Sequence, residues 1–253
     1  MIFKRNRRKI DFLIGGTQKG GTSALDYYLR QHSEIGMGKS KELHFFDNEK
    51  MFSKSKINYS KYEKLFDFAS NKKIYGESTP IYLYWEPSCQ RIWEYNPNIK
   101  LIFILRNPVT RAFSHWNMEY DRNADKEEFG YAVRNEILRT KAGLPFQHRV
   151  YSYADRGFYS EQIRRFKRFF DDEQLMFIKY EDFKTNQKNK LADIFNFLGI
   201  DANDYNFEHK TIHKREKHAE ISEEDKSYLI SKFEYEVLQV EKMLNWDCSD
   251  WLK

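Results

Sequence analysis

The sequence predicts a single α/β domain in which helices cover both faces of a parallel β-sheet. Short apolar runs typical of buried strands alternate along the chain with stretches that carry apolar residues at helical spacing. The turn after the first apolar run is rich in glycine, as in folds that bind phosphates. A chain of 253 residues can build one substantial core, so we expect one domain over residues 1–253.

Four segments are expected to form strands. Leu101–Leu105 and Leu175–Lys179 are the clearest, because they are short and largely apolar. Ile10–Ile14 ends at a Gly-Gly pair, and Lys73–Glu77 is a weaker candidate. Ligands of parallel sheets bind beyond the carboxyl ends of the strands. The loops after residues 14, 77 and 105 are therefore the first places to look for a site.

Helices are expected between these strands. Asn107 is suited to an N-cap and Pro108 to a first helical turn, while Gly199 is suited to ending a helix. Thr22 or Ser23 can cap the helix that follows the glycine-rich turn. The expected helices cover about residues 24–30, 108–121, 159–170, 186–198 and 222–244.

Composition narrows the class of protein. Hydrophobic residues make up 40% and charged residues 32% of the chain, which is typical of a globular protein. The net charge of +5 suits an anionic ligand. Cys89 and Cys248 lack metal-ligand spacing, so we expect reduced thiols and no metal. The basic N-terminus has no apolar signal segment and no stretch is long enough to span a membrane, which favours a cytoplasmic protein without a membrane partner.

The first loop, GGTQKGGTS at residues 15–23, has the features of an anion site. Glycines let backbone amides approach a ligand, and the following helix N-terminus favours negative charge. Lys19 adds a positive charge, and Thr22 and Ser23 add hydroxyl donors. Gly20 and Gly21 separate the lysine from the hydroxyls, so the loop is not a Walker A motif.

The second loop follows the strand at 101–105. Arg106 stands where that strand ends, and Ser114 lies two helical turns beyond Asn107. An arginine and a hydroxyl can share one phosphate. The residues alone leave open that Arg106 pairs with a surface carboxylate instead.

Four segments together resemble the PAPS-dependent sulfotransferases, where PAPS is 3′-phosphoadenosine-5′-phosphosulfate. FLIGGTQKGGTSAL resembles the family's 5′-phosphosulfate loop and LIFILRNPVTRAFSHW its 3′-phosphate strand and helix. KELHFFD at 41–47 resembles the heparan-sulfate-type branch and its bacterial relatives. The segment 156–179, followed by Tyr180-Glu181-Asp182, is similar to a later helix and strand of the family. The resemblance covers about residues 10–218.

The resemblance implies a P-loop-like fold and sulfuryl transfer from PAPS to a hydroxyl or amine, with release of PAP (adenosine 3′,5′-bisphosphate). Lys19 would stabilise the departing phosphate. A basic loop near 209–218 would close over the cofactor through Lys214 and Arg215, although a solvated surface loop is the alternative reading. The implied cofactor-binding residues are Gln18, Lys19, Gly20, Gly21, Thr22, Ser23, Arg106, Ser114, Tyr159, Lys214 and Arg215.

Glu42 matches the glutamate that this branch uses as the base, so it and Lys19 are the expected catalytic residues. His44 is an alternative base, because imidazole titrates near neutral pH. Phe45 and Phe46 are expected in the core. Ser78 stands where the heparan-sulfate branch typically has lysine, and Glu77 is either a second crevice carboxylate or a buried, paired one.

Two other classes of function stay open at this point. A P-loop kinase would bind phosphates on a similar loop, but the strand at 101–105 ends in arginine where a magnesium-binding carboxylate is expected. A non-catalytic nucleic-acid module would suit the positive charge, but no such motif is present and we expect no nucleic-acid partner. The acceptor is expected to be a carbohydrate or glycosylated small molecule. The aromatic region 119–153 is its expected wall, and the oligomeric state is open.

Overall fold

A computed structural model describes residues 8–202 and 220–253 of the chain. Its centre is a five-stranded, wholly parallel sheet with strand order β2-β3-β1-β4-β5. The glycine-rich loop follows the central strand, β1, so the loop lies at the middle of the sheet's carboxyl edge. The strands are β1 Phe12–Gly16, β2 Ile35–Met37, β3 Ile74–Ser78, β4 Lys100–Leu105 and β5 Leu175–Lys179.

Four of these strands are the ones expected from the sequence, each within two residues at either end. The parallel α/β fold is therefore confirmed. The edge strand β2 was missed because it has three residues, one of them Gly36. It forms by pairing with β3, where Ile35 is opposite Ile74. Such a strand depends on its neighbour and leaves little periodic signal in the sequence.

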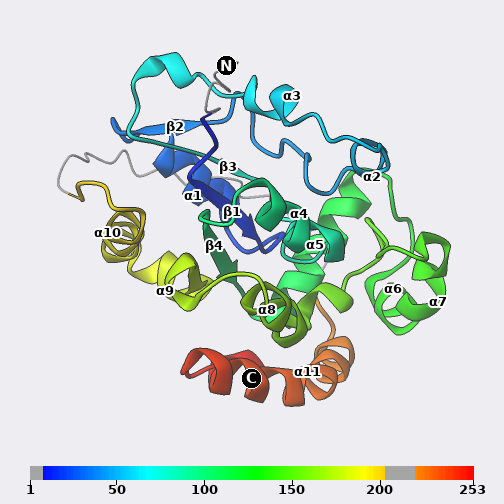
Figure 1. Ribbon diagram of the computed structural model, residues 1–253. Helices are drawn as coiled ribbons and strands as arrows, with labels where there is room; N and C mark the ends of the chain where they lie inside the picture. Colours follow the sequence, from blue (N-terminus) through cyan, green and yellow to red (C-terminus); the bar gives the residue numbers. More distant parts are fainter. Residues whose placement is uncertain (1–7, 203–219) are drawn as a thin grey trace.

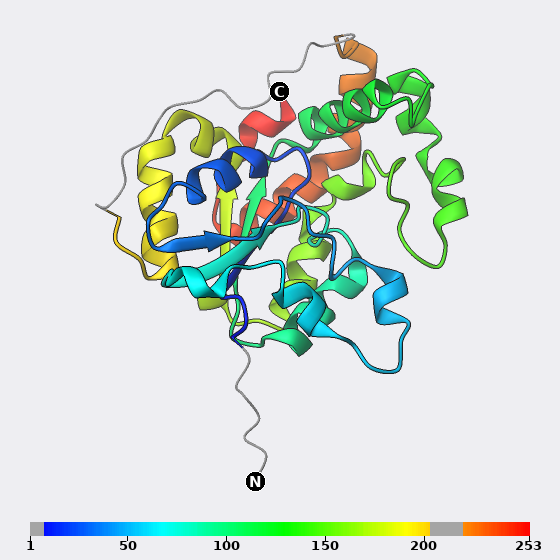
Figure 2. The same cartoon turned by 90° about the horizontal axis from the view of Figure 1, so that it is seen from above.

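Helices cover both faces of the sheet (Figures 1 and 2). The side chains Phe12, Ile102 and Ile104 pack on one face with residues of α1, α9 and α10, and Leu101, Phe103 and Leu105 pack on the other with residues of α4, α5, α8 and α11. The helices are α1 Thr22–Leu29, α2 Glu49–Phe52, α3 Tyr59–Glu63, α4 Glu86–Tyr95, α5 Pro108–Asp121, α6 Phe129–Arg134, α7 Glu136–Thr140, α8 Tyr159–Lys167, α9 Tyr180–Thr185, α10 Gln187–Leu198 and α11 Glu223–Leu244.

The capping residues expected from the sequence are confirmed with one exception, and α8 ends at Lys167, three residues before the expected end at residue 170. The Asn107 side chain accepts hydrogen bonds from the amides of Val109 and Thr110, and Gly199 ends α10 in the left-handed conformation, with φ +77°. The expectation that Thr22 or Ser23 caps α1 is wrong. Gly21 occupies the N-cap with φ +94°, and no side chain caps this helix. The amides at the start of α1 are thus not covered by a capping side chain.

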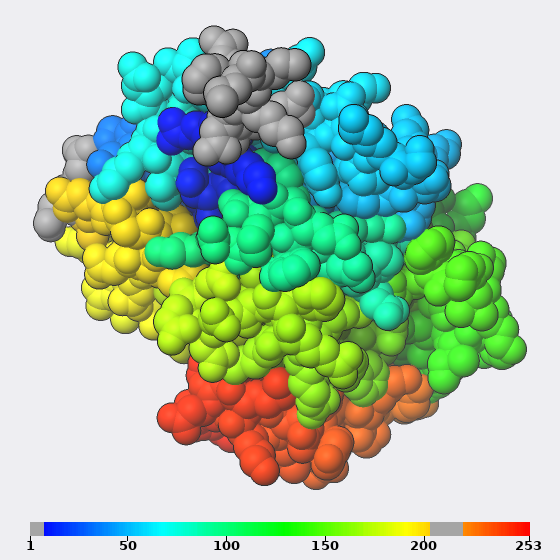
Figure 3. Space-filling model, in the orientation of Figure 1, coloured from blue at the N-terminus to red at the C-terminus, as the bar shows by residue number. Residues whose placement is uncertain are grey.

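The outer surface follows the same layering. On the face shown in Figure 3, α4, α8 and α11 run as successive bands. The short helices α6 and α7 stand to one side of the sheet, beyond α5 (Figure 1). In the described parts of the chain, no helix combines the length and apolar character that crossing a membrane requires.

Candidate active site

A cavity of about 370 Å³ opens at the carboxyl ends of β1 and β4. It is bounded by the glycine-rich loop, the segment after β2, and one flank of α5. Most of the residues expected from the sequence meet there. Its lining includes Gln18, Lys19, Gly21, Thr22, Ser23, Lys41, Glu42, Arg106, Ser114, Met118, Arg122 and Tyr180.

The glycine-rich loop is a tight turn packed against β4. The amide of Thr17 donates to the carbonyl of Ile104 at 2.9 Å, and the amide of Gly20 donates to the carbonyl of Thr17 at 2.9 Å. A Cβ at Gly20 would lie 2.4 Å from the Ile104 carbonyl oxygen, so a side chain is excluded there. Gly20 therefore shapes the loop, although it does not line the cavity. Gly21 does line it, and its φ of +94° disfavours any side chain.

Arg106 is held at the cavity edge by the loop itself. Its Nη1 donates to the carbonyl of Lys19 at 3.1 Å, and its Nε donates to Thr110 Oγ1 at 3.1 Å. The guanidinium lies 5.0 Å from the ring centroid of Tyr180. No carboxylate within residues 8–202 and 220–253 forms an ion pair with Arg106, so the alternative of a surface salt bridge is not supported. The contact couples the two predicted phosphate loops.

Tyr159 holds the backbone of Arg106 in place. Its ring is buried and its hydroxyl donates to the carbonyl of Arg106 at 2.8 Å. It does not line the cavity, so the structure places it behind Arg106. Lys214 and Arg215 lie outside the described residues.

Gln18 is anchored by an arginine to which the sequence assigned no role. Arg156 is fully buried, and its Nη1 donates to Gln18 Oε1. Its Nε donates to Ser152 Oγ at 2.9 Å, and its Nη2 donates to the Arg149 carbonyl at 2.7 Å. Burial lowers the pKa of Arg156 to about 10, so it stays charged at neutral pH. A buried, charged guanidinium therefore holds the Gln18 side chain of the glycine-rich loop.

The cavity has an excess of positive charge. Lys19, Lys41, Arg106 and Arg122 line it, together with the carboxylate of Glu42. The sequence reading did not single out Lys41, Arg122 or Tyr180. Arg122 had a usable signal, because it is eight residues beyond Ser114 and so shares its helix face. This charge suits a ligand with several anionic groups.

Glu42 stands in the segment after β2, close to the loop. Its amide donates to the Ser78 carbonyl at 2.8 Å, and its carboxylate pairs with Lys41 and with His44, whose Nε2 lies 3.6 Å from Oε2. The hydrogen bond from His44 and the charge of Lys41 lower the pKa of Glu42 to about 2. Glu42 is therefore ionised throughout the physiological range.

His44 lies between two carboxylates. Its Nδ1 is 2.9 Å from Oδ2 of Asp47, which also accepts from Arg149 at 2.6 Å. The hydrogen bonds to Asp47 and Glu42 raise the pKa of His44 to about 9. At neutral pH the ring is an imidazolium and cannot accept a proton. This geometry favours Glu42 over His44 as a base.

Glu77 is the buried, paired carboxylate of the two readings that the sequence left open. Its carboxylate accepts from Tyr62 at 2.8 Å, Tyr82 at 2.9 Å and Thr79 at 2.6 Å, and it does not line the cavity. Burial raises its pKa. The Tyr82 hydroxyl also accepts from the amide of Phe45 at 3.1 Å, so this network holds the segment that carries Glu42.

The neighbours of this network complete the segment. Phe45 and Phe46 are buried, as expected. Ser78 is also buried, and its side chain does not reach the cavity lining; among the residues that the structure describes, none forms a hydrogen bond with its hydroxyl.

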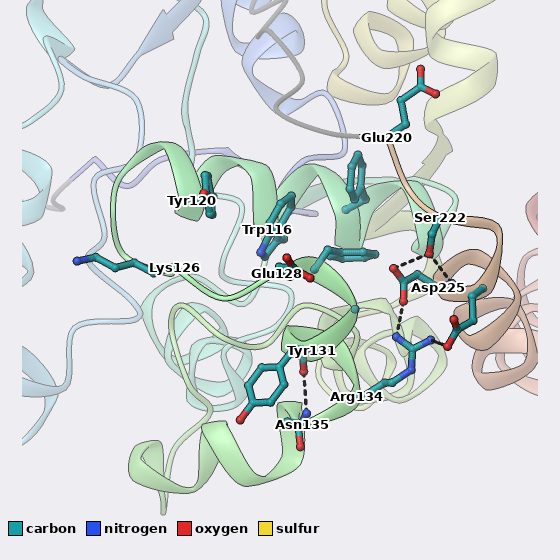
Figure 4. Close-up of a pocket in the computed structure, with 14 residues that line it drawn as sticks. Trp116, Tyr120, Lys126, Glu128, Tyr131, Arg134, Asn135, Glu220, Ser222 and Asp225 are labelled. Atoms are coloured by element: carbon teal, nitrogen blue, oxygen red, sulfur yellow. Dashed lines mark hydrogen bonds and ion pairs between the residues drawn. The ribbon is translucent and has the colours of Figure 1, made fainter.

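A larger cavity, of about 670 Å³, lies on the opposite flank of α5 (Figure 4). Trp116, Tyr120 and Tyr131 line it, and Arg134 closes one end by pairing with Asp225 and Glu224. It shares no lining residue with the cavity at the glycine-rich loop. Tyr131 lines this cavity, whereas Phe146 lines another, so the aromatic residues of 119–153 do not form one wall.

Comparison with known proteins identifies the family. A family described as "Sulfotransferase domain" matches residues 9–234. The chain belongs to this sulfotransferase family. A crystal structure of a sulfotransferase from Alicyclobacillus acidocaldarius superposes with a TM-score of 0.82 at 26% identity, covering 98% of this chain and 100% of that one. The P-loop-like fold of the resemblance is thereby confirmed, and the family match favours a sulfotransferase over a kinase.

Two curated relatives illustrate the range of the family. The membrane-associated sulfotransferase kil1 of Dictyostelium discoideum is 24% identical over 94% of this chain and 65% of its own length. Heparan sulfate glucosamine 3-O-sulfotransferase 5 of Mus musculus is 29% identical over 74% of this chain and 53% of its own length. The chain thus spans about half to two thirds of the length of these relatives.

Proposed function

We propose that this sulfotransferase transfers the sulfuryl group of PAPS to a hydroxyl or amine of a carbohydrate or a glycosylated small molecule, with release of PAP. The observation that carries the proposal is the cavity at the sheet's carboxyl edge. It combines a glycine-rich anion loop, several cations and one ionised glutamate within reach of one another. The residues present therefore fit a ligand with a phosphosulfate and a separate phosphate.

The donor would be held at two points. Gln18, Lys19 and the amides at the start of α1 would hold the phosphosulfate end, and Arg106 and Ser114 would hold the 3′-phosphate. Gly20, Gly21, Thr22 and Ser23 complete the first site, and Tyr159 positions Arg106. Lys214 and Arg215 are proposed to add cofactor contacts. When bound, PAPS supplies the activated sulfuryl group.

Lys19 and Glu42 would carry the chemistry. The ammonium of Lys19 stabilises the negative charge that grows on the leaving phosphate. The carboxylate of Glu42 takes the proton of the acceptor hydroxyl or amine. Because its pKa is low, Glu42 is ionised at neutral pH and can accept this proton.

The proposed carbohydrate acceptor is inferred from the names of related proteins, and the proposed cytoplasmic location from the two cysteines. Several relatives are heparan sulfate sulfotransferases by name, which supports a carbohydrate acceptor. Ser78 leaves a glycosaminoglycan less favoured than other sugars. Cys89 and Cys248 are free and buried, which agrees with a cytoplasmic protein.

Calorimetric titration with PAP, ATP-Mg and ADP, each added to the full chain, tests the proposal. We expect PAP to bind without metal and ATP-Mg to bind far more weakly. Arg106→Ala should weaken PAP binding, whereas Arg134→Ala, a charge-matched control in the other cavity, should not. Preference for ATP-Mg over PAP would reject the proposed cofactor.

A further inference from the structure

A third cavity, distinct from the one beside α5, lies next to the proposed donor site. It has a volume of about 610 Å³ and lies between the segment 44–50 and the loop 142–150. His44 lines this cavity, while Glu42 lines the donor cavity, and the two side chains form an ion pair at 3.6 Å. The two cavities are therefore connected by the ion pair between His44 and Glu42, the residue proposed to take the acceptor proton.

An aromatic platform lies on one side of this cavity. Phe146 is 37% exposed and stacks on the buried Trp85, with ring centroids 5.7 Å apart and planes 23° apart. The guanidinium of Arg149 lies 4.2 Å from the centroid of Trp85. Because Trp85 is fixed by these contacts and by a hydrogen bond to Glu49 at 2.8 Å, Phe146 has a rigid support. A rigid, partly exposed ring is suited to stacking against the apolar face of a sugar.

The opposite side is polar. Asp47 lines the cavity and is 1% exposed; within the described residues its Oδ1 has no hydrogen-bond partner, whereas its Oδ2 pairs with His44 and Arg149. Buried acceptors without a donor are rare in folded proteins. The polar groups that a hydroxylated ligand can reach lie on the rim. Lys50, His148 and Arg149 add further donors around the rim.

The larger aromatic cavity beside α5 lacks this connection. Trp116 and Tyr120 line that cavity (Figure 4). Their positions in the helix put them on the flank of α5 away from Ser114, and none of the described residues that line that cavity also lines the donor cavity. A ligand bound there is separated from Glu42 by the helix. Of the two aromatic cavities, only the one lined by Phe146 includes a residue paired with Glu42.

We propose that the cavity between 44–50 and 142–150 is the acceptor site, and that it binds a sugar ring stacked on Phe146. This inference rests on the proposed sulfuryl transfer. The acceptor hydroxyl oxygen forms the new bond to sulfur and its proton passes to Glu42. The bond between sulfur and the phosphate oxygen breaks, and its electron pair leaves on PAP. His44, Asp47 and Arg149 position Glu42 and do not exchange the proton.

The test measures acceptor binding on PAP-loaded protein by saturation-transfer NMR and calorimetry. The probes are cellotetraose as a neutral sugar, a heparosan tetrasaccharide as an anionic one, and 2-naphthol as a planar aromatic acceptor with a single phenolic hydroxyl. We expect at least one sugar to bind, and Phe146→Ala to weaken it about tenfold. Phe146→Leu keeps the apolar volume but loses the ring, and should weaken binding by a similar factor.

Tyr131→Ala is the matched control, because it removes a 54% exposed ring from the other cavity. It should leave sugar binding unchanged. PAP affinity measured on every variant separates the two proposals. If PAP does not bind the wild-type protein, the proposed function fails. If PAP binds but Tyr131→Ala weakens the sugar and Phe146→Ala does not, the acceptor site is wrong. Binding of 2-naphthol alone, or of no probe, overturns the sugar assignment.

Discussion

The imidazole Nε2 of His44 lies 3.6 Å from the carboxylate Oε2 of Glu42. Both residues have a left-handed backbone, with φ of +61° at Glu42 and +50° at His44. The turn directs one side chain into the donor cavity and the other into its neighbour. Asp47 holds the Nδ1 side of the ring, so the imidazolium of His44 orients the carboxylate of Glu42 through its Nε2.

The first prediction concerns pH. The pKa of His44 is about 9 and that of Glu42 about 2, so the ion pair is complete between these values. A histidine with a raised pKa loses its pairing as pH rises through that pKa. We therefore expect kcat/KM to be level from about pH 5 to 8 and to fall above about pH 9.

His44→Gln is the control for this profile. Glutamine can still donate to Glu42 but does not titrate, so activity should be lower throughout and the alkaline fall should disappear. A wild-type limb near pH 6.5, the ordinary value for histidine, would show that the ring is not held between the two carboxylates.

The second prediction concerns Lys19. Lys19→Ala removes the charge that stabilises the leaving phosphate, so single-turnover rates should fall by about 10²- to 10³-fold. PAP affinity should fall much less. Lys126→Ala, which removes a lysine from the cavity on the other flank of α5, should change neither quantity. Normal turnover in Lys19→Ala would remove this residue from the chemistry.

The third prediction concerns Glu42. Glu42→Gln keeps the shape of the side chain but cannot take a proton, so turnover should fall by about 10²- to 10⁴-fold with PAP affinity preserved. Glu128→Gln in the other cavity is the matched control. If PAP binding is lost along with turnover, Glu42 supports the fold of the site and is not its base.

The fourth prediction concerns Glu77 and stability. Three hydroxyls donate to this buried carboxylate. Glu77→Gln replaces an oxygen with an amide that needs acceptors, so the free energy of unfolding should fall by about 1 to 3 kcal/mol. Chemical denaturation measures the change, and Glu234→Gln on the exposed face of α11 should have no effect. A variant as stable as the wild type would mean that the network does not hold the segment.

The sheet was largely predictable because its central strands are apolar on both faces. Leu101–Leu105 is buried between two helical layers and reads as a continuous apolar run, and the edge strand Leu175–Lys179, which is only partly buried, still reads as a largely apolar run. β2 was not predictable, because its three residues are held by pairing with β3. The cap of α1 was mispredicted since Gly21 takes a left-handed conformation that a hydroxyl residue disfavours.

The candidate site was predictable where chemistry lies in a continuous motif. Lys19 and Arg106 follow adjacent strands, so their convergence follows from the topology. Arg156 could not be placed beneath Gln18, because its position depends on how the chain returns after α7. The pairing of Asp47 with Arg149 joins residues about a hundred positions apart, which no local pattern encodes.

The left-handed turn at Glu42 and His44 sets stability against activity. A residue other than glycine costs about 1 to 2 kcal/mol in this conformation, and glycine relieves that cost. Selection for thermostability would therefore favour glycine at both positions and remove both Glu42, the proposed base, and His44, which orients it. Substitutions that aim to stabilise the protein are better placed on the solvent face of α11, where exposed side chains such as Tyr235 and Leu238 take no part in the proposed chemistry.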